Sequence, residues 1–156
     1  DMQNQIDVMR ASASMPYVSK IVSWNGMKLL DGGCADSIPV KQFRKMGYEK
    51  NVVVLTREDG YEKKPQNTRM AEARYHRYPA FAETLKNRHL VYNRTLKDIR
   101  EMEAKEEIFV IRPSEKLTIS RMEKNLDEIQ KVYDIGRKDA ENCMAKLCRW
   151  LEKPVV

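Results

Sequence analysis

Residues 51–55 read NVVVL, a continuous apolar run of strand length. Runs of this kind are typical of strands that are covered on both faces, as in parallel sheets. Residues 108–111 read IFVI and form a second such run, which Pro113 closes. Because helical patterns alternate with these strands, the sequence predicts an α/β layered fold.

The helical patterns have defined beginnings. Apolar side chains recur at spacings of three and four over residues 81–99, which predicts an amphipathic helix that begins near Pro79 and follows another helix. The last helix is predicted to begin at Asn125, with Glu128 placed as in a capping box. Residues 1–10 are interpreted as the end of a further helix.

A hairpin is predicted in the first third of the chain. Residues 18–22 are rich in β-branched side chains and indicate a strand. Asn25 and Gly26 form the dipeptide of a type I′ turn, and residues 27–30 supply the return strand.

A short helix is predicted after this hairpin. Ser37 is placed to cap it, Pro39 suits its first turn, and Gly47 suits its end. Val40 and Phe43 are expected on its inner face.

The tripeptide Asp31-Gly32-Gly33 is the candidate for chemistry that stands out most. It directly follows the return strand, and carboxylates at strand ends often lie at functional clefts of α/β proteins. The two glycines permit backbone angles closed to other residues and allow close approach to the carboxylate. The alternative is a tight turn in which Asp31 caps the next amides. We predict that Asp31 lies at the end of the strand, with its carboxylate in a cleft or at the surface.

The order of these features resembles the second half of the patatin-like phospholipase family. Small residues and serines at 11–14 precede Pro16, and the hairpin, Asp31-Gly32-Gly33 and a proline-started helix follow. The resemblance extends over residues 12–139 and is strongest to a bacterial, cytoplasmic subgroup. It implies that residues 1–156 are the C-terminal portion of a three-layer α/β/α hydrolase fold.

The resemblance also implies a Ser–Asp dyad in which Asp31 is the catalytic aspartate, with Gly32 and Gly33 completing its motif. The family's serine lies on a G-x-S-x-G elbow, and a Gly-rich loop forms its oxyanion hole. Neither occurs in this sequence, and Ser12 and Ser14 lack flanking glycines, so both are interpreted as small packing residues. We therefore expect a truncated chain whose nucleophile elbow and oxyanion loop lie upstream.

Two functions follow as hypotheses. The first is a lipid acyl-ester hydrolase to which this chain contributes the aspartate, although the chain alone is expected to be inactive. The second is a non-catalytic α/β interaction domain that keeps the fold without a working dyad. The substrate expected for the first is a lipid or another acyl ester, with peripheral membrane contact.

Charge and composition bear on other partners. The 29 Lys and Arg exceed the 23 Asp and Glu, which gives a net charge of +6 and would suit anionic partners. Acidic residues are interleaved almost everywhere, so we expect no nucleic-acid partner. Lost neighbours of the run at residues 51–55 would leave apolar surface and an open edge, which predicts self-association of the fragment.

No cofactor or metal is expected. The sequence has three cysteines at scattered spacing and two histidines, which fits neither a disulfide framework nor a zinc site. Free thiols suit a reducing cytoplasm. His76 and His89 are interpreted as structural or surface residues, because the dyad needs no histidine. The sequence contains no signal peptide pattern and no apolar run of membrane-spanning length.

Overall fold

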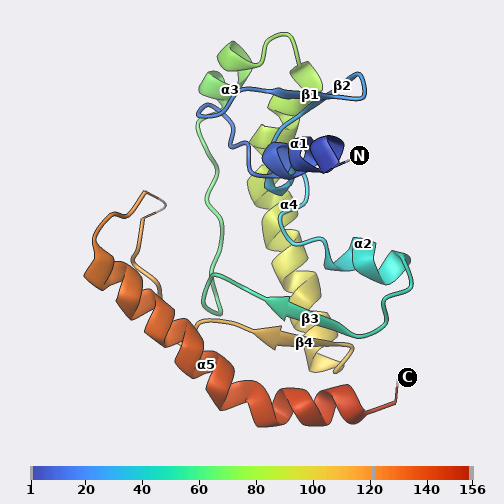
Figure 1. The fold of residues 1–156 in the computed structure, drawn as a ribbon, viewed down its shortest axis with the longest axis vertical. Helices are drawn as coiled ribbons and strands as arrows, with labels where there is room; N and C mark the ends of the chain where they lie inside the picture. Colours follow the sequence, from blue (N-terminus) through green and yellow to red (C-terminus); the bar gives the residue numbers. More distant parts are fainter. Residues whose placement is uncertain (1, 121, 155–156) are drawn as a thin grey trace. The chain divides into compact units, whose positions relative to one another are not determined.

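The computed structural model describes residues 2–120 and 122–154 (Figure 1). The chain divides into two compact units. Unit 1 consists of residues 1–39 and 63–96, and unit 2 of residues 40–62 and 97–156. The long helix α4 contributes its first part to unit 1 and its last part to unit 2.

Unit 1 contains the hairpin and four helical segments. Its elements are α1 (Met2–Ser12), β1 (Val22–Trp24), β2 (Met27–Leu29), the 3₁₀ helix η1 (Gly32–Cys34), α3 (Thr68–Arg74) and the first part of α4 (Pro79–Ala104). The helix expected at residues 1–10 is confirmed and continues to Ser12. The two helices expected before and from Pro79 are confirmed as α3 and α4.

The hairpin turn is confirmed, but its first strand is shorter than predicted. Asn25 and Gly26 have φ of 47° and 76°, as a type I′ turn requires, and Trp24 pairs with Met27. The strand predicted over residues 18–22 is wrong, because β1 begins only at Val22. Tyr17 adopts a φ of 69° and donates its N–H to the hydroxyl of Tyr75 at 2.9 Å, so the chain turns here.

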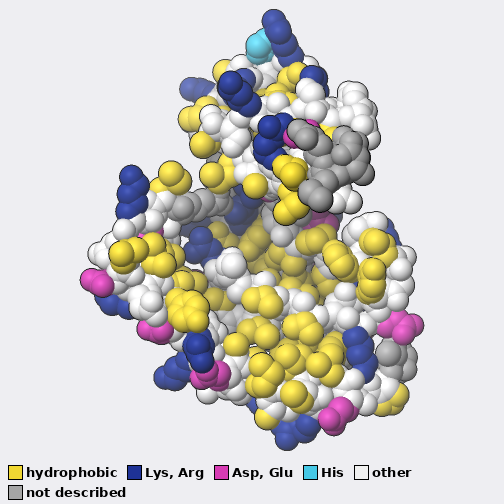
Figure 2. All heavy atoms as spheres, in the orientation of Figure 1, with side chains coloured by type: hydrophobic (Ala, Val, Ile, Leu, Met, Phe, Trp, Pro, Cys, Tyr) yellow, Lys and Arg dark blue, Asp and Glu magenta, His cyan; other side chains and the backbone are white. Residues whose placement is uncertain are grey.

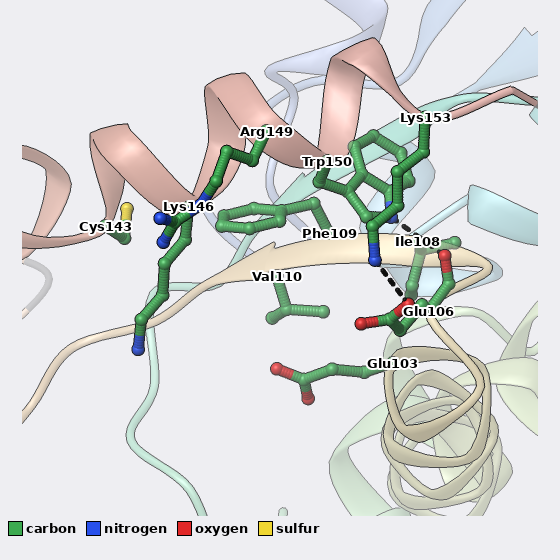
Figure 3. A pocket seen from close by; sticks show the side chains of 10 residues that line it. All are labelled: Glu103, Glu106, Ile108, Phe109, Val110, Cys143, Lys146, Arg149, Trp150 and Lys153. Atoms are coloured by element: carbon green, nitrogen blue, oxygen red, sulfur yellow. Dashed lines mark hydrogen bonds and ion pairs between the residues drawn. The ribbon is translucent and has the colours of Figure 1, made fainter.

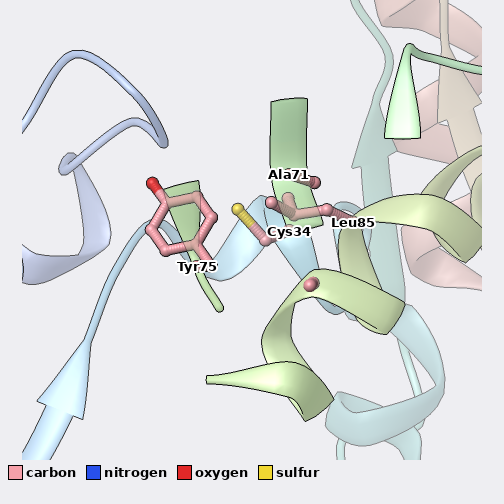
Figure 4. Close-up of a cluster of buried hydrophobic side chains, with 5 residues drawn as sticks. Cys34, Ala71, Tyr75 and Leu85 are labelled. Carbon is pink, nitrogen blue, oxygen red and sulfur yellow. The ribbon is translucent and has the colours of Figure 1, made fainter. Parts of the chain in front are cut away.

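A small apolar cluster holds unit 1 together (Figure 4). Tyr75 is 1 % exposed and meets Phe81 edge to face, with ring centroids 4.8 Å apart. The Cys34 side chain lies beside Tyr75 and is buried as well. The cluster, which comprises Cys34, Ala71, Tyr75, Ala82 and Leu85, therefore anchors η1 against α3 and α4.

Unit 2 is built on a parallel pair of strands. Its elements are α2 (Val40–Lys45), β3 (Asn51–Val54), β4 (Ile108–Ile111), α5 (Leu126–Glu152) and the last part of α4. The strands pair in register from Asn51 opposite Ile108 to Val54 opposite Ile111. Both predicted buried runs are thus confirmed as neighbouring parallel strands.

One face of this pair is only half covered. Phe109 packs against Trp150 of α5, with ring centroids 6.0 Å apart. Val52 and Val54 lie on the same face of the sheet and are 42 % and 68 % exposed. Within the described part of the chain, β3 is therefore not covered on both faces. Figure 2 shows hydrophobic side chains gathered over β3, β4 and α5, so the expected exposed apolar surface is present.

The short helix α2 differs from its prediction in two details. Val40 is buried as expected, but Phe43 is 48 % exposed and meets the ring of Tyr48. Ser37 does not supply the expected cap, because its hydroxyl donates to the carbonyl of Gly33 at 2.6 Å. Gly47 follows the helix with a φ of +91°, as its predicted role at the helix end requires.

Helix α5 begins where the sequence predicts, but the second hydrogen bond at its N-terminus is not the predicted one. The side chain of Asn125 accepts from the N–H of Asp127 at 3.0 Å, which confirms the cap. The predicted capping box is wrong, because the N–H of Asn125 donates to Glu123 and Glu128 pairs with Lys131 instead. Glu123, two residues before Asn125, therefore accepts the hydrogen bond that Glu128 was predicted to accept.

The chain is therefore a mixed α/β protein, as predicted. The described residues form two separate two-stranded sheets, one antiparallel and one parallel. No helix among them is long and apolar enough to cross a membrane.

Candidate functional site

Asp31 lies just beyond the end of the hairpin in unit 1. It follows β2 by two residues and caps η1, with φ of −47° and ψ of 123°. Its N–H donates to the carbonyl of Ser14 at 2.9 Å. This bond ties the end of the hairpin to the turn after α1, so the backbone of Asp31 is held from both sides.

The carboxylate of Asp31 has one oxygen engaged. Oδ1 accepts from the N–H of Gly33 at 2.7 Å, and the side chain is half-buried. This is the tight-turn role that the tripeptide alone suggested. Oδ2 accepts no hydrogen bond from residues 2–120 or 122–154, so one acceptor remains available for a proton-bearing group.

Glycine is needed at position 33 because a side chain there would crowd Asp31, and not because the backbone has a positive φ. Neither Gly32 nor Gly33 has a positive φ, so the expectation of backbone angles closed to other residues is wrong. A Cβ added at Gly33 would lie 3.0 Å from Oδ1 of Asp31, whereas one added at Gly32 would meet nothing within 4 Å. Only the second glycine therefore makes room for the carboxylate.

Arg88 of α4 also holds this turn in place. Its Nε donates to the carbonyl of Gly33 at 2.7 Å, beside the bond from Ser37. Two donors thus satisfy one carbonyl and hold the loop that carries Asp31. Sequence reasoning missed Arg88 as a site residue, because its contact with Gly33 joins positions far apart in the chain.

Cys34 lies next to this polar turn but is not suited to nucleophilic chemistry. Burial raises the pKa of its thiol and is the largest effect, while Arg88 lowers the pKa and Asp31 raises it. The net shift is upward, so the thiol stays protonated at neutral pH. Cys34 therefore acts as a packing residue of the apolar cluster.

The two serines near Asp31 have different surroundings. Ser14 is buried, and its hydroxyl donates to the carbonyl of Arg10 at 2.7 Å, which fits its interpretation as a packing residue. Ser12 is exposed at the end of α1, so its interpretation as a packing residue is wrong. The Ser14 hydroxyl is engaged away from Asp31 and makes no dyad with it.

The histidines bond to their own helices. Nδ1 of His76 lies 3.2 Å from the carbonyl of Ala73, and Nδ1 of His89 lies 3.0 Å from that of Lys86. Within the described ranges, no three His, Cys, Asp or Glu side chains are grouped so that they could hold a metal ion. All three cysteines are free thiols.

The fit around Gly33 leads to a first prediction. Gly33→Ala should lower the free energy of unfolding by about 1–2 kcal/mol, because the new methyl group crowds an oxygen that the Gly33 amide holds in place. Gly32→Ala is the matched control and should stay within about 0.5 kcal/mol of the native chain. Urea unfolding followed by circular dichroism measures both. Equal stabilities of the two variants would show that the space beside Asp31 does not require glycine at position 33.

Two family models match parts of this chain. Residues 3–44 match the patatin-like phospholipase model, and this segment contains the hairpin and Asp31. Residues 78–152 match a domain of unknown function, DUF6363. The second segment contains α4, β4 and α5.

One curated relative is similar over a short segment. The chain is 44 % identical over 55 residues to a protein of Escherichia coli (strain K12) described as "Uncharacterized protein YjjU". The match covers 35 % of this chain and 15 % of that protein, so the chain spans only a small part of the relative's length. No solved structure matches the chain.

Proposed function

We propose that this chain, whose residues 3–44 match the patatin-like phospholipase model, supplies the catalytic Asp31 of a lipid acyl-ester hydrolase. The observation that supports the proposal most is the double anchoring of Asp31 within the matched segment. The Ser14 carbonyl holds its amide, and the Gly33 amide holds Oδ1. An oriented carboxylate with one unengaged oxygen is what a general base needs.

In the proposed mechanism, Asp31 transfers a proton twice. Its carboxylate takes the proton of a serine hydroxyl while the serine oxygen attacks the ester carbonyl. Collapse of the tetrahedral intermediate breaks the bond to the leaving alkoxide, which receives that proton from Asp31. A water molecule then loses a proton to Asp31 as it attacks the acyl-enzyme, and the proton returns to the serine when the fatty acid leaves.

The serine of the proposed dyad comes from another part of the parent protein. The sequence of residues 1–156 contains no G-x-S-x-G motif. Ser14, whose carbonyl contacts Asp31, has its hydroxyl bonded to Arg10. A serine hydroxyl placed about 2.6–3.2 Å from the unengaged oxygen of Asp31 would complete the site.

A non-catalytic interaction domain is the second candidate, and the missing serine motif favours it. Labelling of the full-length protein with a fluorophosphonate separates the two functions. A hydrolase should be labelled at one serine outside residues 1–156, and Asp31→Ala should slow that labelling strongly. A full-length protein without any labelled serine would favour the interaction domain and contradict the hydrolase.

The proposal predicts that the 156-residue chain alone has no esterase activity. Covalent catalysis is lost without the nucleophile, and dyad residues act as a unit. Hydrolysis of p-nitrophenyl butyrate by the chain should equal that of buffer, with the full-length protein as the positive control. Activity of the isolated chain that disappears in Asp31→Ala would instead place the nucleophile within residues 1–156.

A further inference from the structure

A pocket of about 580 Å³ opens in unit 2 between α5 and the last turns of α4 (Figure 3). Its apolar walls come from β4 and from Trp150, and its polar rim comes from both helices. The residues that matter for its chemistry are Glu103, Phe109, Val110, Lys146, Arg149 and Trp150. None of them belongs to the Asp31 site in unit 1.

This pocket follows the free edge of β4. Phe109 and Val110 are consecutive in the strand and point to opposite faces, Phe109 toward α5 and Val110 away from it. Both line the pocket, while its lining includes no residue of β3. A cavity that touches both faces of one strand but not its neighbour must run along the edge remote from that neighbour.

The edge carries unpaired backbone groups. The N–H of Leu55 donates to the carbonyl of Ile111 at 2.8 Å, so Ile111 directs its polar groups toward β3. Alternate residues of a strand direct these groups to opposite edges, so Ile108 and Val110 direct theirs away from β3. Ile108 is only 2 % exposed, whereas Val110 is half-buried, so the groups open to the pocket are those of Val110. No other backbone group in the described part of the chain bonds to those of Ile108 or Val110.

The unpaired charges at the rim are positive. The carboxylate of Glu103 is paired with Arg112, and that of Glu106 with Lys153 at 2.6 Å. Lys146 and Arg149, one turn apart on α5, form no ion pair with any described residue. The groove therefore combines an open strand edge with two uncompensated cations.

We propose that the free edge of β4 binds an extended acidic peptide segment as an added strand. The added strand pairs with the backbone of Val110, and its acidic side chains face Lys146 and Arg149. The edge is four residues long, about 13 Å at 3.3 Å per residue, and so lies alongside about four residues of an added segment. This site goes beyond the proposed hydrolase function, because it lies outside the patatin-like segment at residues 3–44.

Two other occupants fit the groove less well. An acyl chain would cover the polar backbone groups of Val110 without pairing them, which costs free energy. A second copy paired edge to edge through β4 would place its own Lys146 and Arg149 beside those of the first copy. The peptide satisfies both the hydrogen bonds and the charges.

Fluorescence anisotropy with the 156-residue chain tests this proposal. The probe is a fluorescein-labelled peptide of about six residues that alternates Glu and Val. It should bind saturably, whereas a peptide that alternates Lys and Val should not. The same Glu-Val peptide with N-methylated amides should also fail, because it cannot donate to the edge.

The charge contribution has a matched control on the same helix. Lys146→Glu combined with Arg149→Glu should weaken binding of the Glu-Val peptide at least about tenfold, since two attractions become repulsions. The control is Lys131→Glu combined with Lys138→Glu. This double variant changes the charge of α5 by the same amount at positions that do not line the pocket, so binding should stay within about twofold.

The edge contribution is tested with proline. Val110→Pro removes one N–H that faces the pocket and leaves the bonds to β3 intact, so peptide binding should be lost. Val52→Pro is the control, because the N–H of Val52 faces the opposite edge of the pair. Circular dichroism of each variant shows whether it is folded, and the charge variants provide the readout if a proline variant unfolds.

Several results would overturn the proposal. The N-methylated peptide could bind as well as the parent peptide. Alternatively, dodecanoate could displace the peptide while Val110→Pro has no effect. Either result would show that the groove binds amphiphiles and not an added strand. Sedimentation equilibrium could show a dimer that Val110→Pro dissociates, which would make a second copy the occupant. Binding unchanged by both the charge variants and Val110→Pro would place the peptide elsewhere.

Discussion

In the full-length protein, Asp31→Asn is expected to lower kcat for ester hydrolysis by roughly 10²–10⁴-fold, with little change in KM. Asparagine has nearly the same shape, but its amide cannot take the serine proton at neutral pH. The same group must also return the proton to the leaving alcohol, so both halves of the reaction are affected. Substrate binding should persist, because apolar walls and not this carboxylate hold an acyl chain.

The structure makes Asn a clean replacement at this position. The side-chain carbonyl of Asn can still accept from the N–H of Gly33, so the turn around Asp31 should keep its stability. Asp31→Ala removes that acceptor and should also destabilise the protein by about 1 kcal/mol. Comparing thermal unfolding of the two variants separates the catalytic role from the structural one.

Asp36→Asn is the matched control for charge in the same loop. Asp36 is exposed, and its Oδ1 accepts from the N–H of Ile38 at 3.3 Å, so Asn preserves its local bond as well. Its kcat should equal that of the native protein. Native turnover by Asp31→Asn, or an equal loss in Asp36→Asn, would remove Asp31 from the proposed mechanism.

Tyr75→Ala is expected to destabilise unit 1 by about 3–5 kcal/mol, the largest stability effect predicted for this chain. The ring is 1 % exposed and contacts Phe81 edge to face and Tyr17 at a centroid distance of 5.6 Å. Truncation leaves a cavity between α3 and α4 and removes the acceptor for the Tyr17 amide. Urea unfolding should show the loss as a lower midpoint.

Two further variants divide this effect into its parts. Tyr75→Phe keeps the ring and removes only the hydroxyl, so it should cost about 1 kcal/mol. Tyr78→Ala, at a position that is 39 % exposed, should cost less than about 1 kcal/mol. A Tyr75→Ala variant as stable as Tyr78→Ala would show that the apolar cluster does not hold unit 1 together.

The same cluster links stability to the candidate site. Cys34 belongs to it and follows the Asp31 turn by three residues. Loosening the cluster therefore releases η1, whose N-terminal cap is Asp31. We expect Tyr75→Ala to lower activity of the full-length protein at temperatures where Tyr75→Phe is still active.

The sequence by itself determined the features that depend on near neighbours in the chain. The Asn25-Gly26 turn follows from two residues that accept positive φ, and the cap of α5 follows from one side chain at Asn125. The stripe over residues 81–99 has the helical period, and the two apolar runs have strand length and composition. Asp31 could be placed at the end of the hairpin for the same reason.

Only the tertiary structure decided the features that depend on distant residues. Residues 18–22 have strand-forming side chains, yet the bond from Tyr17 to Tyr75, 58 positions away, turns the chain before Val22. Arg88 reaches the carbonyl of Gly33 across 55 positions. No local pattern encodes such pairs, because they depend on how segments pack against one another. The open face of β3 and the free edge of β4 have the same origin, since apolar residues favour a strand but do not specify what covers it.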